Sequence, residues 1–175
     1  MTERRGYEIE LRTKGRRLEG YAALFGTEAR IGRTRETIAP GAFSATLGAR
    51  SDVLALVDHD PSRVLARTRS GSLRLAEDTR GLSFDLDLPD TQIGRDVLAM
   101  AERSDLGGMS FGFTADDEGM AGDVRELRAV TLYEISVVSA WPAYEGTVVS
   151  ARSLIHPRPA LAHAERLLRI AELNA

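Results

Sequence analysis

A serine between two glycines, Ser110 in the pentapeptide 108–112 (GMSFG), is the first candidate nucleophile of this chain. The pattern G-x-S-x-G is typical of a nucleophile elbow, in which a strand precedes the serine and a helix follows it. Here residues 111–115 alternate between two faces and run into two aspartates, which predicts a strand and then a turn. An elbow also places the acid and then the histidine after the serine, but only His156 and His163 follow, in a Pro- and Ala-rich tail. We therefore expect Ser110 to lie on a strand, as a nucleophile of another architecture or as a plain surface serine.

A nucleophilic serine needs a base, and His59 is the best placed of three histidines. It follows the apolar run Val53–Val57, which predicts a buried strand that would hold the ring rigidly. Its neighbours Asp58 and Asp60 would point to the opposite face of a strand, so neither is its natural partner. Two alternatives stay open: Asp60-Pro61 favours a turn in which His59 is inert, and the two aspartates with His59 could ligate a metal, although no further His or Cys ligand is apparent.

The third candidate is Glu134, a carboxylate in the middle of the apolar strand predicted over 124–138. Alternation puts it on one face together with Val130, Leu132, Ser136 and Val138. A buried carboxylate is costly unless it is paired, and an imidazole is a suitable partner whose tautomer it would fix. The alternative is an edge-strand glutamate that faces water or an arginine, and the residues alone do not choose between the two.

Most of the remaining elements that must position these residues are short strands. Candidate strands cover residues 7–11, 18–25, 53–57, 64–68, 73–76 and 82–88, besides the segments around Ser110 and Glu134. Two short helices are predicted, one opened by Pro40 and ending near Leu47, the other over 91–103 with Asp90 as its cap. This pattern predicts a mainly β fold with α (α+β), a small closed β-barrel of about seven strands with surrounding helices.

The composition narrows the class of protein. The 175 residues suffice for one domain with a real core, and 43% hydrophobic and 28% charged residues are typical of soluble globular proteins. A net charge of −3 gives no drive toward nucleic acid or anionic membranes. The absence of cysteine excludes a thiol nucleophile and disulfides. No apolar run predicts a membrane span and no signal peptide is recognisable, and nothing indicates a cofactor.

The C-terminal part differs from the rest. Pro157 and Pro159 mark a break, after which residues 160–173 carry an apolar face at helical spacing. We therefore expect a domain of residues 1–152 and a helical tail of residues 153–175.

Five segments together resemble the HK97-type phage prohead protease family, which is related to the herpesvirus assemblin-like serine proteases. They are, in order, residues 18–25 (LEGYAALF), 38–43 (IAPGAF), 56–61 (LVDHDP) with 64–67 (VLAR), 108–113 (GMSFGF) and 133–138 (YEISVV). The resemblance covers roughly residues 6–148.

The resemblance implies a herpesvirus-protease-like barrel in which Ser110 matches the nucleophile, His59 the family histidine and Glu134 the acidic position. It implies a serine endopeptidase that cleaves the scaffolding region of the major capsid protein, and itself, inside the assembling prohead in the host cytoplasm. The tail would then be a self-cleaved or targeting segment, or would serve a homodimer like that of the herpesvirus relatives.

Two other classes of function remain as alternatives. A non-catalytic scaffold or assembly protein would bind the capsid protein without needing both Ser110 and His59. An elbow-type esterase would need His156 or His163, and the chain order argues against it.

Overall fold

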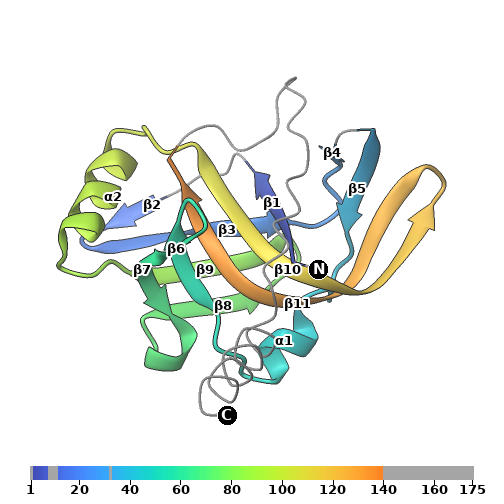
Figure 1. The fold of residues 1–175 in the computed structure, drawn as a ribbon, viewed down its shortest axis with the longest axis horizontal. Helices are drawn as coiled ribbons and strands as arrows, with labels where there is room; N and C mark the ends of the chain where they lie inside the picture. The colour runs from blue at the N-terminus through green and yellow to red at the C-terminus, as the bar shows by residue number, and fades with distance from the viewer. Residues whose placement is uncertain (1, 8–11, 32, 140–175) are drawn as a thin grey trace, which may run out of the picture.

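The computed structural model describes residues 2–7, 12–31 and 33–139 (Figure 1). Its larger sheet contains seven strands: β1 (Glu3–Tyr7), β4 (Ala29–Ile31), β5 (Thr34–Ile38), β6 (Leu54–Val57), β7 (Asp60–Arg67), β10 (Gly108–Ala121) and β11 (Val124–Val138). Its smaller sheet contains four: β2 (Arg12–Lys14), β3 (Arg17–Leu24), β8 (Leu73–Glu77) and β9 (Gly81–Asp87). The helices are α1 (Ser44–Gly48), α2 (Gln92–Glu102) and a 3₁₀ turn over Thr68–Ser70.

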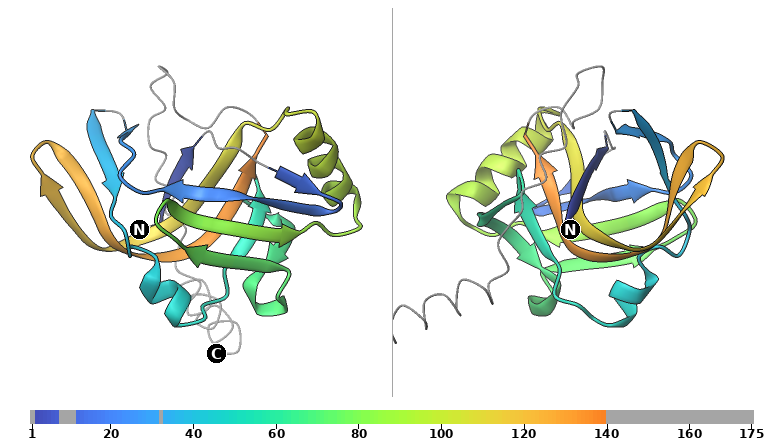
Figure 2. Two further views of the ribbon diagram at one scale, coloured as in Figure 1. Left: turned by 180° about the vertical axis from the view of Figure 1, so that it is seen from behind. Right: turned by 45° about the vertical axis from the view of Figure 1, so that its right-hand side comes forward.

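The larger sheet is mixed and the smaller one is antiparallel. The main path of the larger sheet runs β1-β10-β11-β5-β4. Strand β6 also pairs with β11, and β7 pairs with β6. Both β5 and β6 run parallel to β11, β5 beside Val124–Leu127 and β6 beside Glu134–Val137. The strands of the smaller sheet cross those of the larger one (Figures 1 and 2). Strand β11 is therefore the element that joins the β6–β7 hairpin to the rest of the sheet.

The predicted mainly β fold with few helices is confirmed, whereas a closed barrel is not. Within the described ranges, eleven strands rather than about seven form two separate sheets, with no closed circuit of pairing. The sequence pattern favoured a barrel because closure removes edges, but two packed sheets bury the same apolar faces.

The core lies between the two sheets. On β10, Met109, Phe111 and Phe113 are fully buried, as their alternation predicted. The ring of Phe111 contacts that of Phe113 at 5.1 Å and that of Phe43 at 5.6 Å between centroids. The smaller sheet contributes Leu18, Leu82 and Leu86, none of them exposed. Burial of each large apolar side chain is worth about 1.5–3 kcal/mol, so the inner face of β10 is a main source of stability.

The predicted helix over 91–103 is confirmed as α2, but its cap is not Asp90. The Thr91 side chain accepts the hydrogen bond from the Gly94 N–H at 3.3 Å. Asp90 instead pairs with Arg16 at 2.7 Å and Arg95 at 2.9 Å. Pro40 does not open a helix either, because α1 begins only at Ser44. Local sequence located these helices, while neighbouring charges decided the caps.

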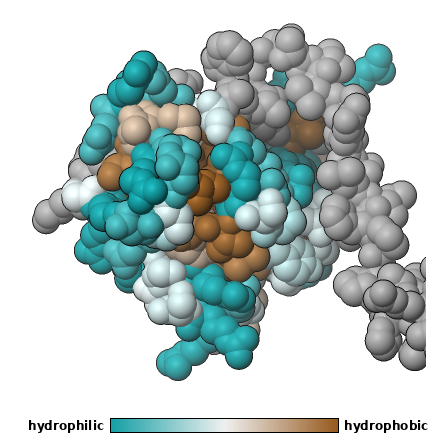
Figure 3. Space-filling model, turned by 60° about the vertical axis from the view of Figure 1, so that its left-hand side comes forward, coloured by the Kyte–Doolittle hydropathy of each residue, from teal (hydrophilic) through white to brown (hydrophobic). Residues whose placement is uncertain are grey.

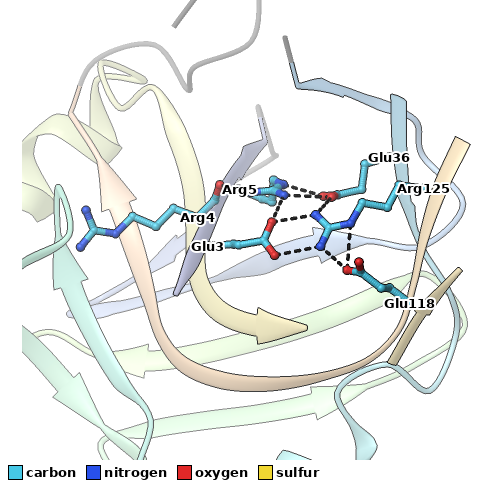
Figure 4. Close-up of polar contacts among 6 residues, drawn as sticks. All are labelled: Glu3, Arg4, Arg5, Glu36, Glu118 and Arg125. Carbon is cyan, nitrogen blue, oxygen red and sulfur yellow. Dashed lines mark hydrogen bonds and ion pairs between the residues drawn. The ribbon is translucent and has the colours of Figure 1, made fainter. Parts of the chain in front are cut away.

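Strand β1 is tied to the sheet by a cluster of buried charges (Figure 4). Arg5 donates to Glu36 at 2.5 and 2.9 Å and to Glu3 at 2.5 Å, and its guanidinium lies 5.3 Å from the centre of the Phe113 ring. Arg125 on β11 donates to Glu3 at 2.7 Å and to Glu36 at 2.7 Å. Since Glu36 and Arg5 are almost fully buried, this cluster fixes the N-terminal strand against β10.

The cluster predicts acid sensitivity through Glu3. The hydrogen bond from Arg125, helped by that from Arg5 and opposed by burial, lowers the pKa of Glu3 from 4.5 to about 2. A depressed pKa contributes stability above the unfolded value, and this contribution is lost as the pH falls from about 5 toward 2. We expect the stability advantage of wild type over Glu3→Gln to shrink over that range, by up to about 3 kcal/mol. Urea denaturation at pH 2–6 measures it, and a constant difference between the two curves would contradict this role of Glu3.

Some predicted features lie outside the described residues. These are most of the strand over 7–11, the domain boundary at 152/153 and the tail helix over 160–173. Among the described helices, none has the length and apolarity needed to cross a membrane.

Candidate active site

Ser110 lies inside strand β10, as the alternation of its neighbours predicted. It pairs with Gly6 of β1 on one side and with Ser136 of β11 on the other. The strand continues to Ala121, so no helix follows the serine and the elbow geometry is absent. Ser110 is only 4% exposed. Its side chain lies on the face of the sheet opposite to Met109 and Phe111, which belong to the core.

His59 occupies the two-residue turn between β6 and β7. Asp58 and His59 have φ angles of 52° and 60°, and Val57 pairs with Asp60 across the turn. Two consecutive positive φ values are typical of a type I′ hairpin turn, which usually contains Asn or Gly. Residues of other types adopt this left-handed backbone conformation only where surrounding contacts hold them in it. His59 thus lies in a turn, as that alternative expected, but the turn residues are Asp58 and His59, and Asp60-Pro61 begins β7.

Asp58 attaches this turn to the end of β11. Its N–H donates to the Val137 carbonyl at 2.9 Å, and its carboxylate accepts from the Ser139 N–H and hydroxyl, each at 2.8 Å. Arg63 also donates to it, at 3.1 Å. Asp58 is therefore not the partner of His59, as expected. Among the described residues, no group of three or more His, Cys, Asp or Glu is arranged to hold a metal ion.

We expect Asp58→Ala to destabilise the protein by about 1–3 kcal/mol. The substitution removes the acceptor for Ser139 and places a residue with a Cβ but no compensating bond at φ 52°. Asp58→Asn is the matched control, because Asn tolerates positive φ and keeps an acceptor oxygen. Thermal unfolding of the two variants measures the difference, and equal melting temperatures would contradict the anchoring role.

A β-bulge at Tyr133 puts Leu132 and Glu134 on opposite faces of the sheet. Gly112 pairs with Glu134, but the next residue of β10, Phe113, pairs with Leu132, so Tyr133 is the extra residue on β11. Leu132 therefore shares the core face with Phe113, and the prediction that it shares a face with Glu134 is wrong. Simple alternation carried no signal of the bulge. Glu134 itself is buried, with 8% exposure, which excludes the water-facing alternative.

Glu134 and His59 form a hydrogen-bonded pair. The His59 Nδ1 and Glu134 Oε1 atoms are 2.7 Å apart, and their side chains are only 16% and 11% exposed. Because an ionised carboxylate can only accept, a neutral imidazole in this pair carries its proton on Nδ1 and leaves Nε2 as an acceptor. This is the tautomer that a general base needs. The two residues are 75 positions apart in the chain and meet because β6 pairs with β11.

Gly112 makes room for this carboxylate. A Cβ at position 112 would lie 2.3 Å from Glu134 Oε1 and 3.1 Å from its Cδ. The space beside Ser110 that this glycine leaves open is therefore occupied by the Glu134 side chain.

Two cross-strand rows define the outer face around Ser110. The first runs Gly6, Ser110, Ser136, Leu56, Val64, and the second runs Arg4, Gly112, Glu134, Leu54, Arg67. Arg4 points away from the buried cluster, opposite to Arg5 (Figure 4). At the other end Val64 is 40% exposed, on β7, and apolar atoms reach the surface on the side of the molecule that carries α2 (Figure 3). The outer face around Ser110 thus ends at Arg4 on one side and at Val64 and Arg67 on the other.

Sequence reasoning assigned no role to Ser136, which the structure places between the two candidate groups. Its hydroxyl donates to Glu134 Oε2 at 2.6 Å and accepts from the His59 N–H at 3.2 Å, and it is fully buried. The one feature of the sequence that could have pointed to Ser136 is its place between Ile135 and Val137 in an apolar strand. Ser110 faces this network, although the hydrogen bonds of the described residues include none between Ser110 and His59. The alternative bases His156 and His163 lie outside those residues.

The chain is similar to known proteins both in its fold and in its sequence. Among solved structures, the capsid assembly protease gp21 of bacteriophage T4 is similar in fold, with a TM-score of 0.54 at 10% identity over 79% of this chain and 96% of that chain. A comparison with curated proteins gave no significant match. The family model of caudovirus prohead serine proteases matches residues 5–158, which confirms the resemblance noted in the sequence. Since this match spans most of its length, the chain belongs to the caudovirus prohead serine protease family.

Proposed function

We propose that this protein is a serine endopeptidase of capsid maturation in which Ser110, His59 and Glu134 act in series. Membership of the prohead serine protease family supports the reaction class. One observation supports the roles proposed for these residues most strongly. His59 Nδ1 is hydrogen-bonded at 2.7 Å to the buried Glu134 carboxylate, on the face of β10 that bears Ser110.

In the proposed mechanism His59 Nε2 takes the proton of the Ser110 hydroxyl while Oγ attacks the peptide carbonyl carbon. The proton then passes to the leaving amine as the C–N bond breaks, and water releases the acyl-enzyme by the same route. Glu134 keeps the proton on Nδ1 and stabilises the imidazolium. A bond between Ser110 and His59 would form when substrate binds, because catalytic hydrogen bonds often tighten only in the substrate complex.

The proposed substrates are capsid protein precursors, including the scaffolding region of the major capsid protein, and the protease itself. The site of action would be the assembling prohead in the host cytoplasm. Residues 153–175 would be a separate segment that is removed, that targets the protease to the particle, or that serves a homodimer.

The test is processing of the capsid precursor of the same phage by the purified protein, with and without an organophosphonate that modifies activated serines. We expect a shortened capsid protein by mass spectrometry, inhibition by the reagent, and a covalent adduct on the peptide that contains Ser110. His59→Ala should lose the adduct. Processing that resists the reagent would overturn the serine mechanism.

The second candidate function is that of a scaffold or assembly protein. One observation favours it: among the described residues, Ser110 and His59 share no hydrogen bond. It predicts that the protein binds the capsid precursor without shortening it and that no adduct forms on Ser110.

A further inference from the structure

Ser136 is the one hydroxyl among the described residues that touches both partners of the His59–Glu134 pair. It donates to Glu134 Oε2 at 2.6 Å and accepts from the backbone N–H of His59 at 3.2 Å. It is not exposed at all, and it lies directly opposite Ser110 in the β10–β11 register.

These contacts constrain both groups. The two Glu134 oxygens have different donors, Oε1 facing the His59 ring and Oε2 facing Ser136. A rotation of the carboxylate would therefore break both bonds at once. The backbone of His59 is in the left-handed region and its N–H is bound to the same Ser136 oxygen. One hydroxyl thus fixes the acid at one side and the residue that carries the base at the other.

We propose that Ser136 is a positioning residue that sets the geometry of the His59–Glu134 pair over Ser110. This inference rests on the proposed function of that pair. Ser136 does not touch the substrate and moves no proton in the reaction. It acts by restricting where Glu134 and His59 lie, and small displacements of catalytic groups lower rates strongly.

The first experiment compares Ser136→Ala with Thr46→Val. Thr46 on α1 is a buried hydroxyl that bonds to the same strand, β11: it donates to the Val130 carbonyl and accepts from the Leu132 N–H, both at 3.0 Å. Both variants lose one donated and one accepted bond. We expect kcat for capsid precursor cleavage to fall about 10- to 100-fold in Ser136→Ala with KM unchanged, and to stay within about twofold of wild type in Thr46→Val. Equal loss of kcat in the two variants would overturn the proposal.

The second experiment asks whether Ser136 acts through Glu134. In a Glu134→Gln background, Ser136→Ala should cause a smaller fold-loss of kcat than in wild type, because the part of its effect that depends on Glu134 is already lost. The low-field proton resonance of the His59 Nδ1–H should shift in Ser136→Ala and not in Thr46→Val. Additive losses of kcat, or an unchanged resonance, would overturn the proposal.

Two further comparisons distinguish a loss of positioning from misfolding of the variant and from failure of the proposed function. If Ser136→Ala does not fold, Ser136→Cys serves in its place, since its thiol fills similar space with a much weaker donor, and we expect the same loss of kcat. A failure of the proposed function is recognised separately, because wild type itself would then form no adduct on Ser110. A wild type that forms the adduct, with full kcat in Ser136→Cys, would overturn only the positioning role.

Discussion

Glu134→Gln should lower kcat by about 10³- to 10⁴-fold while the protein stays folded. If the amide NH₂ faces His59, the ring must take its proton on Nε2 and can no longer act as a base. If the amide oxygen faces His59, the NH₂ donates to Ser136, which already accepts from the His59 N–H. The Ser136 proton is then left buried without its acceptor, and no negative charge stabilises the imidazolium. Both orientations therefore lose activity.

The measurement is cleavage of the capsid precursor at saturating substrate, with Ser110→Ala as the uncatalysed floor and thermal unfolding as the test of folding. Glu126→Gln is the matched control, because Glu126 lies on the same strand and its one side-chain partner among the described residues is the exposed Arg128. We expect its kcat to equal that of wild type. A Glu134→Gln protein with more than a tenth of the wild-type kcat would remove Glu134 from the mechanism.

The second large effect is expected from Gly112→Ala. A Cβ at 2.3 Å from Glu134 Oε1 is impossible without movement, and the carboxylate is held from its other side by Ser136. We expect the carboxylate to leave its place beside His59, so that kcat falls by about 100-fold or more. Overpacking should also lower the free energy of unfolding by about 1–3 kcal/mol.

Gly119→Ala is the matched control on the same strand. Its Cβ would meet only the guanidinium end of Arg128, which is flexible and can move aside. We expect wild-type kcat and a change in unfolding free energy within about 0.5 kcal/mol. The measurements are cleavage kinetics and urea denaturation of both variants. Wild-type kcat in Gly112→Ala would mean that the position of the Glu134 carboxylate does not matter for the reaction.

The family assignment and the residue assignment rest on different grounds. The match over residues 5–158 shows a prohead serine protease family member, while the likeness to the T4 capsid assembly protease at 10% identity concerns the fold. The roles proposed for Ser110, His59 and Glu134 are argued from the His59–Glu134 bond and from the face of β10 that Ser110 occupies. The two predictions above test those roles directly.

Patterns along the chain were enough to predict the types of most elements and to select candidate groups for the site. Alternation over 109–113 predicted a strand with Met109, Phe111 and Phe113 in the core, and helical spacing predicted α2, because both periods depend only on neighbours along the chain. The same reasoning excluded the elbow around Ser110 and selected His59 and Glu134 as the candidate base and acid.

How these groups meet depends on pairing between distant segments. The parallel pairing of β6 with β11 brings His59 to Glu134 across 75 positions, and the register of β10 with β11 puts the carboxylate on the same face as Ser110. The role proposed for Ser136 depends on the same register, which places its hydroxyl beside both partners. Register, bulges and sheet closure depend on how all the strands pack together. For that reason periodicity along one strand could not predict them, and it favoured a barrel where the chain forms two sheets.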